Sequence, residues 1–139
     1  MNANAIITEN LMKLLCSKPN EFKNITFDEN ITLTELLEKL RGKSGITKPD
    51  IVIRTGLSKT YIYQLFNGEY IPGRNVLLRL AFALNASVDD TQRLLMLAKK
   101  SVLYPKIKRD AAIIVCLSQK NSETETNEFL QSIGEETLL

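Results

Sequence analysis

The chain has 139 residues, of which 44% are hydrophobic and 24% charged, and its formal net charge is +2 with no histidine. That length suffices for one domain with a real core, or for a small domain with attached helices. Because histidine, a glycine-rich phosphate loop, a Ser-x-x-Lys motif and a catalytic pair of acidic residues are all missing, the sequence predicts a protein that is not an enzyme and binds no cofactor or metal.

An N-terminal arm is expected over residues 1–31. A short amphipathic helix is predicted within it, because apolar residues recur at helical spacing until Pro19 ends the pattern: Ile7, Leu11, Leu14 and Leu15. Residues 20–30 mix polar and apolar residues and suggest an irregular connector. The arm would either cover one side of the domain or exchange with a partner subunit.

The first core helix is predicted to begin after Thr32. Thr32 and Glu35 can form a capping box, in which each side chain accepts a backbone N–H at the start of the helix. Four leucines then recur at the spacing of one buried helical face: Leu33, Leu36, Leu37 and Leu40. We expect this helix to end near Gly45.

Two short helices joined by a tight glycine turn are predicted next. Thr47 can cap the first of them. Pro49 and Asp50 suit its first turn, because proline loses no hydrogen bond there and an acidic residue favours the helix dipole. Gly56 is expected to end this helix, and Ser58 can cap the second one shortly afterwards. This arrangement is a helix-turn-helix.

The segment resembles the Cro/repressor family of bacterial and phage helix-turn-helix regulators. The resemblance covers about residues 33–98 and rests on the following residues: Thr47, Lys48, Ile51, Val52, Gly56, Leu57, Ser58, Tyr61, Ile62, Gln64, Asn67 and Gly68. It implies a five-helix, lambda-repressor-like fold whose second and third helices read DNA in a sequence-specific manner. The chain departs from the family where glutamine, alanine and a polar residue are usual, at Lys48, Val52 and Phe66.

The outer side of the second helix is expected to carry the residues that read bases: Lys59, Thr60, Tyr63 and Gln64. Ile62, Leu65 and the ring of Tyr61 take the inward positions. Lysine can donate to guanine, glutamine can pair with the edge of adenine, and threonine can bond a base or contact a thymine methyl group. By the resemblance, the family's base contacts fall at Lys59, Thr60 and Gln64.

Phosphate contacts are expected from four other residues: Lys48, Ser58, Asn67 and Arg74. The resemblance places Lys48 where the family usually holds the DNA backbone. Residues 43–79 contain six cationic and two acidic residues and so carry +4, whereas residues 110–139 contain six acidic residues and one lysine and carry −5. Phosphates would attract the first segment and repel the second, unless both are ordinary solvated faces.

Aromatic residues near the second helix permit another interpretation. Tyr63, Phe66 and Tyr70 could form a surface that binds a protein partner, so that the chain would be an interaction module such as an antitoxin or an adaptor. Half-buried core positions are the other explanation for aromatic residues at this spacing.

Two more helices complete the predicted domain. The fourth follows Pro72 and closes at Asn85, which tolerates the left-handed conformation better than most residues. Ser87 caps the fifth, whose inner side carries Leu94, Leu97 and Ala98.

The remaining residues predict two additional helices. The run from Ala111 to Leu117 is apolar at every position, so a helix there would need to be covered all round. A helix over residues 123–133 would supply one neighbour, with Phe129, Leu130 and Ile133 on its apolar edge. A second copy of the protein would supply the other, so we expect a homodimer formed through these C-terminal helices.

Two segments of the chain have similar sequences. Residues 87–95 and 122–130 share a serine, an acidic residue, a threonine and two apolar residues at the same offsets. Each segment follows an apolar helix that a proline, Pro72 or Pro105, introduces. A repeated two-helix unit would explain this pattern, and so would the recurrence of capping boxes in any helical protein.

No stretch approaches the roughly 20 apolar residues that span a bilayer, and no signal peptide is indicated, so we expect a cytoplasmic protein without membrane contact. Cys16 and Cys116 lie far apart without a CxxC motif and are interpreted as reduced, buried thiols, with a disulfide or metal site as the alternative. The sequence thus predicts an all-α transcriptional regulator that binds double-stranded DNA as a homodimer. Its expected parts are the arm (1–31), the helix-turn-helix domain (32–100) and a C-terminal helical extension (101–139).

Overall fold

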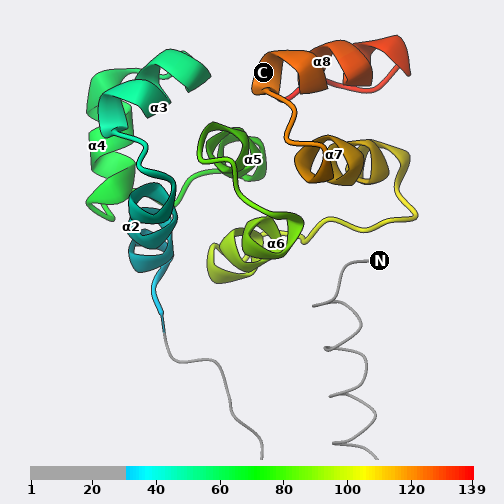
Figure 1. Ribbon diagram of the computed structural model, residues 1–139. Coiled ribbons are helices and arrows are strands. Elements are labelled where there is room, and N and C mark those ends of the chain that lie inside the picture. The colour runs from blue at the N-terminus through cyan, green and yellow to red at the C-terminus, as the bar shows by residue number, and fades with distance from the viewer. Residues whose placement is uncertain (1–30) are drawn as a thin grey trace, which may run out of the picture. The chain divides into compact units, whose positions relative to one another are not determined.

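The computed structural model describes residues 31–139, and within that range the chain forms helices and no strand (Figure 1). The helices are α2 (Leu33–Ser44), α3 (Lys48–Thr55), α4 (Lys59–Phe66), α5 (Arg74–Ala83), α6 (Val88–Leu97), α7 (Lys108–Ser118) and α8 (Glu123–Ser132). The predicted all-α fold is confirmed, with α2–α6 as the five-helix domain and α7 and α8 as the two additional helices. The predicted N-terminal helix and Cys16 lie outside the described residues.

Residues Thr32–Leu139 form one compact unit. At its centre α5 and α6 pack against each other, with α3 on α5 and α2 on α6 (Figure 1). On the other side of this central pair, α8 contacts α5 and α7 contacts α6. A functional boundary at residue 100 stays a prediction. None of the helices in the described part of the chain is long and apolar enough to cross a membrane.

Local signals set the helix ends as predicted. Thr32 and Thr47 cap α2 and α3, each through reciprocal hydrogen bonds with the acidic residue three positions later. Gly45 and Gly56 end these helices with φ angles of 68° and 71°, a left-handed conformation that glycine adopts without steric cost. These caps fix where α3 ends and therefore where the turn into α4 begins.

The first additional helix, α7, is covered in part by its own chain. On α7, Ala112, Ile113, Cys116 and Leu117 are buried, and Cys116 is a free thiol as predicted. Val115 is 44% exposed in the single chain. Cover of this remaining side by a second copy stays a prediction. The α5–α6 pair and α8 cover only the inner sides of α7.

The similarity between residues 87–95 and 122–130 extends to their hydrogen bonds, with Ser122 lying 35 residues after Ser87. Each serine side chain accepts the backbone N–H three residues later, at the start of α6 and of α8. Thr91 and Thr126, which are also 35 residues apart, each donate a hydrogen bond of 2.8 Å from Oγ1 to the backbone oxygen of their serine. The pairs α5–α6 and α7–α8 are therefore two copies of one helical hairpin.

Candidate nucleic-acid interface

The candidate interface is built on α3, α4 and the turn that joins them. The N–H of Gly56 donates to the backbone oxygen of Val52 (2.9 Å), which ends α3. Ser58 Oγ accepts the N–H of Tyr61 (3.1 Å) and caps α4. The inner side of α4 is buried in the core through Ile62, Leu65 and Phe66. The position of α4 is thus set at its start by a cap and along its length by apolar packing.

The outer side of α4 carries the four predicted base-reading residues. Lys59 and Thr60 are exposed, whereas Tyr63 and Gln64 are half-buried. Lys59 Nζ lies 5.8 Å from the centre of the Tyr63 ring, within the range of a cation–π contact. α4 contains no acidic residue. This side of α4 therefore offers donors, acceptors and one positive charge, without a negative charge that would repel DNA.

Lys48 connects the helix-turn-helix to α2. Its Nζ lies 3.5 Å from Glu38 Oε1 and over the rings of Tyr63 and Phe66, at 5.1 and 5.5 Å from their centres. Burial would raise the pKa of Glu38, but the hydrogen bonds and positive charges of Arg41 and Lys48 outweigh it and hold this pKa below its usual value. The carboxylate therefore stays charged at neutral pH and pairs with Lys48.

A Glu38→Gln variant should bind DNA more tightly, by a few-fold, if Lys48 contacts a phosphate. The substitution removes the charge that holds Lys48 Nζ and leaves this ammonium group free for the DNA backbone. Fluorescence anisotropy at fixed salt concentration measures the affinity. In a Lys48→Ala background the same substitution should give a smaller gain, and an equal gain in both backgrounds would remove Lys48 from the contact.

The other predicted phosphate residues are placed differently from one another. Ser58 and Asn67 are exposed at the two ends of α4, where a phosphate can reach them. Arg74 is engaged within the protein instead. Its Nε donates to the backbone oxygen of Ser101 (2.8 Å), and its Nη2 donates to Asp110 Oδ2 (2.9 Å). The structure gives Arg74 a role in holding α7, and a phosphate contact from it stays a prediction.

The aromatic surface that would bind a protein partner is not assembled. Phe66, expected at an edge of α4, is only 5% exposed because its ring packs into the core beneath Lys48. Tyr63 is half-buried, and of the three rings only Tyr70, at 55%, is mostly exposed. The observations therefore do not favour the interaction-module interpretation over DNA binding.

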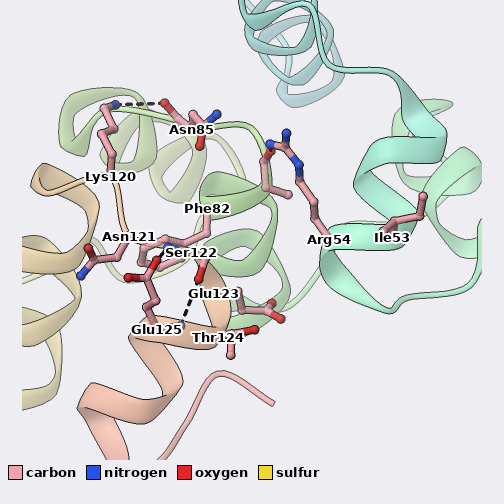
Figure 2. Close-up of a pocket in the computed structure, with 11 residues that line it drawn as sticks. Ile53, Arg54, Phe82, Asn85, Lys120, Asn121, Ser122, Glu123, Thr124 and Glu125 are labelled. Carbon is pink, nitrogen blue, oxygen red and sulfur yellow. Dashed lines mark hydrogen bonds between the residues drawn. The ribbon is translucent and has the colours of Figure 1, made fainter.

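A groove of about 460 Å³ lies between α3 and the C-terminal hairpin, which is formed by α7 and α8 (Figure 2). Its lining combines Arg54 of α3, the α5–α6 turn and residues 120–125. The cationic groups there already have partners within the protein. Arg54 donates to the backbone oxygen of Ala83 (2.7 Å), and Lys120 donates to that of Asn85 (3.0 Å). Within residues 31–139, no three potential metal ligands come together here or elsewhere.

Arg79 of α5 links the C-terminal hairpin to α3. Its Nε donates to Glu123 Oε1 at the start of α8 (2.6 Å), and its Nη2 donates to the backbone oxygen of Thr55 at the end of α3. Both side chains of this ion pair are largely buried. The sequence did not reveal the pair, because no local spacing connects residues of α5 and α8. Arg79 neutralises part of the acidic C-terminal segment and is not free for phosphate.

Comparison with protein families identifies part of the chain. Residues 32–94 match the family model described as a helix-turn-helix domain. The matched range spans α2–α5 and most of α6, which includes the capped turn and the outer side of α4. Neither the curated proteins nor the solved structures gave a significant match to this chain.

Proposed function

We propose that this chain regulates transcription by binding double-stranded DNA at specific sequences, because residues 32–94 match a helix-turn-helix domain, which is typical of DNA-binding regulators. In this binding mode α4 lies in the major groove and α3 crosses the DNA backbone. The observation that carries the proposal is the outer side of α4. It presents Lys59, Thr60 and Gln64 on a helix that is capped, free of acidic residues and held by a buried inner side.

The proposed base contacts follow from side-chain chemistry. Lys59, in the first turn of α4, donates to guanine O6 and N7. Gln64 pairs with the edge of adenine, and Thr60 bonds a base or contacts a thymine methyl group. Tyr63 lies between Lys48 and Lys59, within 5.1 and 5.8 Å of their Nζ atoms, and this supports a phosphate or base contact by its hydroxyl group. Lys48, Ser58, Asn67 and Arg74 are the proposed phosphate contacts.

The charge distribution supports the same orientation. The acidic C-terminal segment belongs to α7, α8 and the residues after them, and these helices pack on α5 and α6 rather than on α4. Glu123, at the start of α8, is paired with Arg79. DNA that approaches α4 therefore meets the cationic part of the chain first, while the acidic part lies behind the central helix pair.

Selection from a random pool of DNA duplexes tests the proposal. We expect enrichment of one sequence motif, and an affinity for it that falls steeply as salt rises. Of the four proposed phosphate contacts, Lys48 and Arg74 are cationic and can each neutralise a phosphate, so the slope of log K against log salt should be about −2, at roughly −0.9 for each neutralised phosphate. An absence of enrichment, or a slope near zero, would remove DNA binding from this chain.

A homodimer stays a prediction. Two copies that read half-sites about 34 Å apart are the usual way for such domains to gain specificity. The apolar run on α7 motivated this prediction, and most of that run is accounted for within one chain: Ala112, Ile113, Cys116 and Leu117 are buried by neighbouring helices. The stoichiometry on DNA therefore depends on what the α7–α8 hairpin does.

A further inference from the structure

The repeat of α5–α6 in α7–α8 extends beyond the helices. Arg74 donates through Nε to the backbone oxygen of Ser101 (2.8 Å), and Arg109, which lies 35 residues later, donates through Nε to that of Glu136 (2.9 Å). The backbone N–H of Leu103 binds the side chain of Gln92, and that of Leu138 binds the side chain of Asn127 in the same way, at 2.7 and 2.8 Å. The duplicated unit thus runs from Arg74 to Leu103 and from Arg109 to Leu138.

Contacts between the two units are reciprocal. Arg74 Nη2 of the first unit donates to Asp110 of the second (2.9 Å), and Arg109 Nη2 of the second donates to Asn75 of the first (3.1 Å). Asp110 is the repeat equivalent of Asn75, because 35 residues separate them. In reciprocal contacts of this kind, each unit donates an equivalent hydrogen bond to the other. Such contacts are characteristic of an interface with two-fold symmetry.

The position of the pseudo-two-fold axis is marked by Asn85 and Lys120. These residues are repeat equivalents, both have positive φ angles (53° and 59°), and Lys120 Nζ donates to the backbone oxygen of Asn85 (3.0 Å). Contact between a residue and its own equivalent is expected beside a two-fold axis. The helix contacts agree, since α5 touches α8 and the equivalent α7 touches α6. The two hairpins therefore pair as two subunits of a symmetric dimer would.

The outer sides of the two hairpins differ. Leu80 and Leu94 are fully buried in the first hairpin, whereas their equivalents Val115 and Phe129 are 44% and 41% exposed. Polar residues replace apolar ones at nearby equivalent positions: Ala83, Leu84 and Leu97 correspond to Ser118, Gln119 and Ser132. In proteins built of stacked helical repeats, the terminal repeat carries a more polar outer side, because that side faces water.

We infer that α7–α8 act as a built-in second subunit, because they occupy the self-complementary side of α5–α6. Their own outer side is more polar than that of α5–α6, so the chain is a monomer that reads one non-palindromic DNA site. A side of α5–α6 that fits its own duplicate would also fit a second copy of itself, if it were free. The reciprocal arginine contacts fill it within the chain. The part of this inference that concerns DNA rests on the function proposed above.

Sedimentation velocity of the full chain and native mass spectrometry of its complex with a selected duplex test the inference. We expect one chain of 15.7 kDa in solution at high micromolar concentration, one chain on each duplex, and a selected motif without two-fold symmetry. A dimer in either measurement, or a palindromic motif that binds two chains, overturns it. If selection enriches no motif, the DNA proposal fails, while the mass in solution still decides the role of α7–α8.

Variants of the outer side provide a second test. Val115→Glu and Phe129→Glu place a charge at half-exposed positions, so both variants should bind the selected duplex within about twofold of the unmodified chain. A loss of tenfold or more, with an unchanged circular dichroism spectrum, would show that copies meet through this side and that α7–α8 do not end the packing.

Discussion

Replacing Lys59 and Gln64 together with alanine should abolish the preference for the selected site and leave the fold intact. Both residues lie on the outer side of α4, Lys59 exposed and Gln64 half-buried, so neither substitution opens the core. Each base contact contributes about 1–3 kcal/mol of discrimination, so the double variant should lose about 2–6 kcal/mol, or thirtyfold and more in the ratio of specific to non-specific affinity. Competition binding at fixed salt concentration measures this ratio.

Lys106→Ala is the matched control for the loss of one positive charge. Lys106 is exposed on the connector between α6 and α7, away from α4. This variant should keep the site preference and the affinity, because a distant surface charge is screened at physiological salt. If the double variant retained the preference of the original chain, Lys59 and Gln64 would not be part of the reading surface.

Asp110→Ala should lower the free energy of unfolding by about 3 kcal/mol. Asp110 is 3% exposed and accepts hydrogen bonds from Arg74 (2.9 Å) and from the backbone N–H of Tyr104 (3.0 Å). Removing its carboxylate leaves the charge of Arg74 without its ion-pair partner, with only the backbone oxygens of Ser101 and Val102 still bound, and leaves the backbone N–H of Tyr104 without a partner. Urea unfolding measures the change, with an unchanged slope showing that the denatured state is the same.

The repeat supplies the control for this prediction. Asn75→Ala removes the equivalent contact, to Arg109, at an exposed position, and should cost less than about 1 kcal/mol. Asp110→Asn makes the two contacts chemically alike, so its effect should lie between those of the two alanine variants. Equal losses for Asp110→Ala and Asn75→Ala would contradict the importance assigned to burial.

Local signals carried most of the fold that the sequence could predict. Capping residues and glycine turns act within one helical turn, so Thr32, Thr47, Gly56 and Ser58 fixed the starts and ends of α2, α3 and α4 before any packing was known. The echo around Ser122 was visible for the same reason. Features of this kind depend on neighbours in sequence, which a single chain displays directly.

Packing across elements decided the rest. The pairs Glu38–Lys48 and Arg79–Glu123 join helices that only the folded chain brings together, so no spacing in the sequence announced them. Phe66 was left open between an aromatic binding surface and a half-buried core position, because the sequence of α4 does not reveal the helices that bury it. The way in which the two hairpins pack was equally hidden from the sequence, because their reciprocal contacts join residues 36 and 34 positions apart.

Arg79 ties the C-terminal hairpin to the helix-turn-helix, because it donates to both Glu123 and Thr55. Thr55 is the last residue of α3, and the Gly56 turn into α4 follows it. One guanidinium group therefore holds the start of α8 and the end of α3 in a fixed relative position.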